Sequence, residues 1–124
     1  MALVDEPHEI LYRAILPDES MWDKEFNRPS PATFIDKKGL SVVKRGKRTE
    51  KETISALKKK IKSTKAIAKI SVNACLDINT YPIDKPTSKD SYHAELWNSK
   101  IEKLIDYSKR KLLAEKVEVL NFDF

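Results

Sequence analysis

Residues 66–78, AIAKISVNACLDI, decide the fold that this sequence predicts. Apolar residues recur at every second position of this stretch, and polar or small residues stand between them: Ile70, Val72, Ala74, Leu76 and Ile78. This alternation is typical of a strand with one buried face. We therefore expect one strand over the whole stretch, whose second face is exposed to solvent or lines a pocket.

A helix is predicted directly before this strand. Residues 49–52 read Thr-Glu-Lys-Glu, a capping box in which Thr49 and Glu52 satisfy each other's backbone amides. Ile54, Leu57 and Ile61 follow at helical spacing and predict the buried stripe. The lysines of this segment then point to solvent.

Further upstream, the pattern indicates strands and turns. Residues 9–16 are mostly apolar and stop at Pro17, which favours a first strand. Residues 32–35 and 40–44 flank a short connection that contains Gly39, and glycine adopts the positive φ that such a turn needs. We expect a β-hairpin there.

Downstream of residue 78, the sequence predicts a loop, a strand, a helix and a strand. Residues 79–90 contain Pro82 and Pro86 without periodicity, which favours a loop. Residues 93–97 are predicted to be a short strand. A second capping box at Ser99 predicts a helix to about Ala114, and residues 116–122 are predicted to form the last strand.

The predicted fold class is α+β, with a small, mostly antiparallel sheet and two amphipathic helices packed on it. The length of 124 residues fits a single domain over residues 1–124. We expect six apolar residues to be buried and in mutual contact: Ile70, Val72, Leu76, Ile101, Leu104 and Ile105.

Composition excludes several classes of function. No apolar run approaches the 18 or so residues of a membrane span, and the first residues lack the basic segment of a secretory signal. The single cysteine, Cys75, favours a reducing compartment, so we expect a cytoplasmic protein. Two glycines build no phosphate loop, and two histidines give no metal-ligand spacing. We expect neither a metal nor a cofactor.

Positive charge is concentrated in one segment. Residues 37–69 carry thirteen bases and two acids, while the chain as a whole has a net charge of +5. Such a block attracts polyanions, although a solvated helix face has the same appearance. The candidate residues for binding nucleic acid or phosphate are Lys44, Arg45, Lys47, Arg48, Lys51, Lys58, Lys59 and Lys62.

Three polar groups are candidates for chemistry. Arg13 stands in an otherwise apolar strand, where its planar fork suits a phosphate or carboxylate. His93 and Glu95 point to the same face if their segment is extended, which suits proton transfer. Arg28 and Ser30 lie in a proline-rich loop. Each group also has a structural interpretation: an outward arginine, a hydrogen-bonded histidine and an ordinary connection.

Short motifs at these positions resemble those of a group of small bacterial and phage proteins with no known activity. The motifs are YRAI at residues 12–15, RPS with a phenylalanine four residues later at 28–34, GLSV at 39–42 and HAE at 93–95. The resemblance implies a bacterial or phage origin. It also supports treating Arg13, Arg28, Ser30 and His93 as one candidate cluster.

Three functions remain open from the sequence. The first is binding of nucleic acid or another phosphate-rich partner through the lysine-rich segment. The second is a subunit or inhibitor that docks this segment on an acidic protein. The third is a small enzyme that processes a nucleotide or phosphoester, in which Arg13 and Arg28 hold the phosphate and His93 moves a proton next to Glu95.

Overall fold

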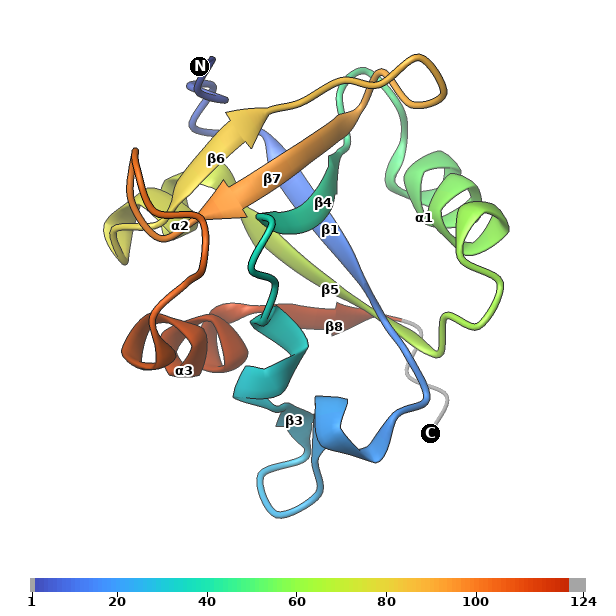
Figure 1. Cartoon of the computed structure of the whole chain (residues 1–124). Coiled ribbons are helices and arrows are strands. Elements are labelled where there is room, and N and C mark those ends of the chain that lie inside the picture. The colour runs from blue at the N-terminus through green and yellow to red at the C-terminus, as the bar shows by residue number, and fades with distance from the viewer. Residues whose placement is uncertain (1, 121–124) are drawn as a thin grey trace.

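The computed structural model describes residues 2–120 and confirms the α+β fold class. Three α-helices pack on an antiparallel sheet of six strands in the order β6-β7-β4-β1-β5-β8 (Figure 1). The strands are β1 (Ile10–Ile15), β4 (Leu40–Lys44), β5 (Ala66–Ser71), β6 (Tyr81–Asp84), β7 (His93–Trp97) and β8 (Glu118–Leu120). A separate small sheet pairs β2 (Trp22–Asp23) with β3 (Arg28–Pro29).

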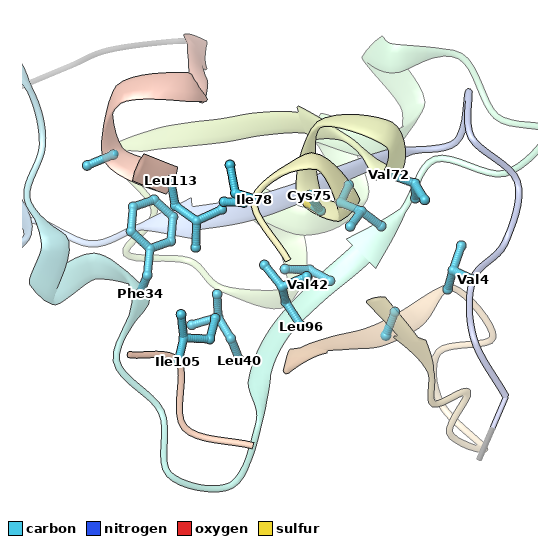
Figure 2. Close-up of a cluster of buried hydrophobic side chains, with 13 residues drawn as sticks. Val4, Phe34, Leu40, Val42, Val72, Cys75, Ile78, Leu96, Ile105 and Leu113 are labelled. Carbon is cyan, nitrogen blue, oxygen red and sulfur yellow. The ribbon is translucent and has the colours of Figure 1, made fainter. Parts of the chain in front are cut away.

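The helices cover opposite faces of the large sheet. Helix α1 (Glu50–Lys60) packs Leu57 against Tyr12, Ala14 and Val43 on one face. The other face carries the larger core, which α2 (Val72–Asp77) and α3 (Tyr107–Lys116) cover (Figure 2). Two 3-10 helices, η1 (Glu19–Met21) and η2 (Pro31–Phe34), complete the fold, and Phe34 of η2 joins this second core.

The helix and capping box predicted for α1 are confirmed, and of its apolar stripe Leu57 is buried, whereas Ile54 and Ile61 are half-buried. The Thr49 hydroxyl accepts from the Glu52 amide at 3.1 Å, and the Glu52 carboxylate accepts from the Thr49 amide at 2.9 Å. Two acids lie in the first turn and three lysines in the last, which suits the helix dipole. The helix ends at Lys60, just before Ile61.

The prediction of one strand over residues 66–78 is wrong beyond Ser71. The Ser71 hydroxyl accepts from the Ala74 amide at 3.1 Å and caps α2, which occupies the second half of the stretch. In a helix, Val72 and Cys75 share one face, and both are fully buried, whereas Leu76 is 37% exposed. The apolar residues of this stretch fit a strand by their alternation, but Val72, Cys75 and Ile78, spaced three residues apart, also fit one face of a helix.

The predicted hairpin of residues 32–35 with 40–44 is also wrong. Residues 31–34 form η2, with Ser30 as N-cap and Pro31 in the first turn, where its fixed φ favours a helical start. Strand β4 pairs with β1 and β7. Gly39 does adopt a positive φ of 103°, so the turn before β4 was correctly placed.

The segment that was predicted to be a loop contains a strand. Tyr81–Asp84 forms β6 and pairs with β7, although Pro82 lies within it. Because β6 is an edge strand of the sheet, the missing amide of Pro82 costs no internal ladder bond. Strand β7 spans His93–Trp97 as predicted.

The second helix begins later in the structure than the sequence predicts. The Ser99 hydroxyl does accept from the Glu102 amide at 2.8 Å, but the capped segment is only a turn, and α3 begins at Tyr107. Ile101 is 89% exposed and Leu104 is 42% exposed, so their predicted burial is wrong. Ile105 is buried as predicted, and Ile70 is half-buried against the core.

The last predicted strand, residues 116–122, lies partly outside the described residues. Within residues 2–120 the strand is β8, which begins at Glu118 and pairs with β5. Over the same residues, no helix is long and apolar enough to cross a membrane.

Candidate anion-binding groove

Two adjoining hollows lie between helix α1 and the sheet. The first, which we name the pocket, has a volume of about 130 Å³ and is lined by residues of β1, β4 and α1. The second, which we name the groove, has a volume of about 670 Å³ and lies between α1 and residues 87–93. The two hollows share Val43, Leu57, Lys60 and His93. Figure 1 shows α1 on the side of the sheet away from α2 and α3.

Arg13 lies where strands β1 and β4 separate. The two strands pair only at Leu11 with Lys44 and at Tyr12 with Val43. Beyond this point, the guanidinium of Arg13 joins the strands instead: Nη1 donates to the Ser41 carbonyl at 2.9 Å, and Nε donates to the Thr33 carbonyl at 2.8 Å. The arginine thus replaces backbone pairing with side-chain pairing, and it lines the pocket.

The charge of Arg13 has no carboxylate partner within residues 2–120 at ion-pair distance, 4.0 Å or less. Burial lowers the pKa of Arg13 from its ordinary value, and the negative charge of Asp36 acts in the opposite direction. Arginine keeps its proton in proteins. The structure therefore holds a half-buried cation at the wall of a hollow.

His93 reaches the same pocket from β7. Its Nδ1 lies 2.8 Å from the Lys85 carbonyl, and a carbonyl only accepts, so Nδ1 carries a proton. In the neutral ring, Nε2 is then an acceptor, and it lies 3.4 Å from the Ser41 hydroxyl. Arg13 and His93 thus meet at Ser41, one at its carbonyl and the other at its hydroxyl.

The other candidates for chemistry lie elsewhere. Glu95 accepts from Trp97 Nε1 at 2.9 Å, while the His93 ring is held by Lys85 and Ser41, so the expected pairing of Glu95 with His93 is not formed. Arg28 lies over the Phe26 ring at 4.7 Å and 3.9 Å from Glu115 of α3.

Ser30 donates its hydroxyl to the Ser20 carbonyl, an ordinary loop contact. Neither Arg28 nor Ser30 lines the pocket or the groove. Of the predicted cluster, the structure brings together only Arg13 and His93.

Four basic residues lie in the lining of the groove, which also contains apolar and neutral polar side chains. Arg48, Lys59, Lys60 and Lys89 line it, and Asp90 is the acid among its lining residues. The Arg48 guanidinium stacks over the Tyr92 ring at 3.7 Å, a cation–π contact that fixes both side chains. The Lys60 ammonium pairs with Asp90 at 3.0 Å.

Two of the eight predicted basic residues, Arg48 and Lys59, line the groove. Lys44 is paired with Asp84 at 2.6 Å, and Arg45 donates to the Arg48 carbonyl at 3.2 Å. The remaining four are exposed around α1 and the turn before it: Lys47, Lys51, Lys58 and Lys62.

Sequence reasoning did not select Ser41, Lys60 and Lys89 as site residues. The lysine run at residues 58–60 was the signal for Lys60. Ser41 lies within the GLSV motif at 39–42, but nothing in the sequence indicated that it lies near residues 87–93, because that proximity depends on the sheet order.

Residues 2–120 contain no group of three or more His, Cys, Asp or Glu side chains placed to hold a metal ion. Comparison of the chain with protein-family models, with curated proteins and with solved structures finds no match in any of the three.

Proposed function

We propose that this protein binds the phosphate backbone of nucleic acid along α1, with the groove as the centre of the contact. The observation that carries the proposal is the composition of the groove, where Arg48, Lys59, Lys60 and Lys89 face a single acid, Asp90. Phosphate contacts of this kind give affinity without base recognition. Exposed Lys58 and Lys62 extend the same positive surface along the helix.

The geometry of the groove supports a polyanion over an isolated ion. Its volume of about 670 Å³ exceeds the space of one phosphate, and its cations come from three segments: the turn before α1, α1 itself and residues 87–93. Cations distributed along a hollow contact successive phosphates. A bacterial or phage origin, which the motif resemblance implies, stays part of this proposal.

Salt dependence tests the proposal. With several phosphate contacts, the affinity for a DNA or RNA duplex falls as salt rises, with a log–log slope of roughly −3 to −6. Replacing Lys59 and Lys89 by Gln is expected to flatten the slope by about 2, because two contacts are lost. The matched control replaces Lys111 and Lys116 of α3 by Gln, two exposed lysines on the helix that packs on the opposite face.

Two outcomes overturn the proposal. One is the absence of salt-dependent binding, and the other is an equal effect of the groove pair and the α3 pair. An acidic protein partner, the alternative from the sequence, predicts that the groove pair weakens a protein complex and leaves nucleic-acid affinity unaffected.

The phosphoester-processing alternative has less support than binding. It requires Arg13 and Arg28 at one ligand, but Arg28 is stacked on Phe26 beside Glu115. The expected contact between the His93 ring and the Glu95 carboxylate is also absent, because Glu95 accepts a hydrogen bond from Trp97 instead. The proposed function is therefore binding without a reaction step.

A further inference from the structure

We propose that the pocket between β1, β4 and α1 binds a small carboxylic acid with an apolar body, with Arg13 as the residue that receives the carboxylate. This site is separate in chemistry from the phosphate contacts of the groove, and it does not depend on the proposed function. Three features of the pocket carry the inference: its walls, its size and its unpaired cation.

The walls of the pocket are mainly apolar. Ala14, Val43 and Leu57, which belong to the core cluster on this face, line it together with Leu16, Met21 and Ile61. Apolar surface of this kind favours a hydrocarbon body, because burial of such a body removes apolar area from water. A hydrated phosphate gains nothing from these walls.

The size of the pocket limits the ligand. An apolar cavity of about 150 Å³ accommodates benzene, and the pocket measures about 130 Å³. One ring or a chain of about six carbons therefore fits. A nucleoside, with a base and a sugar, is too large to enter fully.

The cation in the wall supplies the recognition of charge. Arg13 donates Nε and Nη1 to backbone carbonyls, and Nη2 donates to no residue within 2–120. No carboxylate of the described chain forms an ion pair with this guanidinium. The nearby negative charge of Asp36 only opposes the lowering of the Arg13 pKa by burial. Arg13 is half-buried, so its free Nη2 is available to a ligand in the pocket. A ligand carboxylate supplies the missing negative charge through a charge-assisted hydrogen bond.

Polar groups at the same pocket favour a single negative charge on the ligand. His93 and Ser41 line the pocket, and their mutual contact of 3.4 Å takes up the hydroxyl proton of Ser41, so neither adds a charge to that of Arg13. Lys60 also lines the pocket, but its charge is already paired with Asp90 at 3.0 Å. One unpaired guanidinium matches one carboxylate, whereas a phosphate monoester carries more charge than the pocket offers.

Titration of the wild-type protein with matched ligands tests the proposal without any variant. Benzoate, benzamide, hexanoate, inorganic phosphate and a short peptide ending in a free Phe carboxylate are titrated, and binding is followed by NMR shifts of the Ala14 and Leu57 methyl groups. Benzoate is expected to bind at least about tenfold more tightly than benzamide, because only benzoate carries the charge. A tighter complex with the peptide identifies a chain terminus as the source of the carboxylate, and a tighter complex with benzoate identifies a free acid.

Two variants with matched controls locate the site. Ser41→Leu fills the pocket from its exposed side and is expected to weaken benzoate binding by about tenfold or more, whereas Ser55→Leu, an exposed serine of α1 outside the pocket, leaves it unchanged. Arg13→Gln removes the charge and is expected to abolish the preference for benzoate over benzamide. Arg45→Gln removes an equal charge outside the pocket and keeps that preference.

The proposal is overturned by equal binding of benzoate and benzamide, by phosphate binding as tightly as benzoate, or by the absence of shifts at Ala14 and Leu57. It is also overturned if Ser41→Leu and Ser55→Leu bind benzoate equally. Failure of the nucleic-acid assay leaves these results unaffected, because the ligands of the two tests occupy different hollows.

Discussion

Lys60 and Asp90 form an ion pair of 3.0 Å that joins the last residue of α1 to the segment before β7. The pair spans the groove, because both residues line it. Although partial burial acts in the opposite direction, the Lys60 ammonium and the Tyr92 amide hold the pKa of Asp90 below its usual range. A phosphate in the groove would therefore compete with the Asp90 carboxylate for the Lys60 ammonium.

Asp90→Asn is expected to raise the affinity for nucleic acid. The substitution frees the Lys60 ammonium, and the Asn carbonyl retains the hydrogen bond from the Tyr92 amide, which is 2.9 Å in the structure. Partly exposed pairs of this kind are worth up to about 1 kcal/mol, so we expect an increase of about two- to fivefold. Filter binding at several salt concentrations measures it. Asp77→Asn, an exposed acid on α2, is the control, and an equal increase in both variants contradicts the prediction.

The buried Tyr12 predicts a loss of stability at high pH. Burial, together with the hydrogen bond of 3.0 Å to Glu50, raises the pKa of Tyr12 from 10.0 to about 12. Between these two values the unfolded chain releases the phenolic proton and the folded chain keeps it, so stability falls as pH rises through this window. Below pH 10 the contribution is constant.

Thermal unfolding from pH 9 to 12 measures the effect. Lysines also titrate in this range, so the informative quantity is the difference between wild type and Tyr12→Phe. Tyr12→Phe removes the phenol and keeps the ion pair of Glu50 with Lys69 at 2.6 Å. The melting temperature of the variant is expected to decline less steeply, and parallel curves for the two proteins contradict the prediction.

The corrected position of α3 changes which apolar residue matters for stability. Leu113 is 1% exposed within the larger core (Figure 2), and Leu113→Ala is expected to cost about 2–5 kcal/mol through the cavity it leaves. Ile101 is almost fully exposed, and Ile101→Ala is expected to change stability by less than about 0.5 kcal/mol. Urea unfolding compares the two variants, and a larger cost at Ile101 contradicts the fold in this region.

The sequence predicted the elements whose local signals agreed with one another. In α1, the capping box at Thr49, the apolar stripe and the terminal lysines all indicated the same helix, and the structure confirms it. Strand β7 and the fold class were also predicted correctly. These elements are specified mainly by neighbours in the sequence.

The errors occurred where one pattern suited two structures. Residues 72–78 alternate like a strand, yet Ser71 caps a helix that buries Val72 and Cys75. At Ser99 the predicted cap forms, but Ile101 and Leu104 are exposed and no helix continues from it. Tertiary packing decided both cases, and packing is not encoded in a short window.

The candidate site was predictable only in part, for a related reason. Arg13 and His93 stood out as polar residues in apolar strands, and the structure brings them together at Ser41. Only the sheet order, which places β4 between β1 and β7, shows that Ser41 and Lys89 belong to the site. The separation of Arg28 likewise follows from the small sheet of β2 and β3, beside α3.

Cys75 provides the last prediction, because its thiol reports on the opening of the core. It is fully buried in the core cluster that also contains Val72 and Leu113, and burial raises the pKa of its thiol to about 12, with a smaller opposite contribution from Thr80. Only the thiolate reacts with iodoacetamide. In the native protein at pH 8, alkylation is therefore expected only through transient opening of the core, and it is complete in denaturant.

Leu113→Ala sharpens this test, since it destabilises the same cluster without touching the thiol chemistry. If opening is global, alkylation of this variant accelerates by the factor that its loss of stability predicts, about tenfold for each 1.4 kcal/mol. Ile101→Ala, outside the core, is expected to react at the wild-type rate. Rapid alkylation of the native wild type at the rate of an unfolded cysteine would falsify the burial of Cys75 under α2, and with it the helix that replaced the predicted strand.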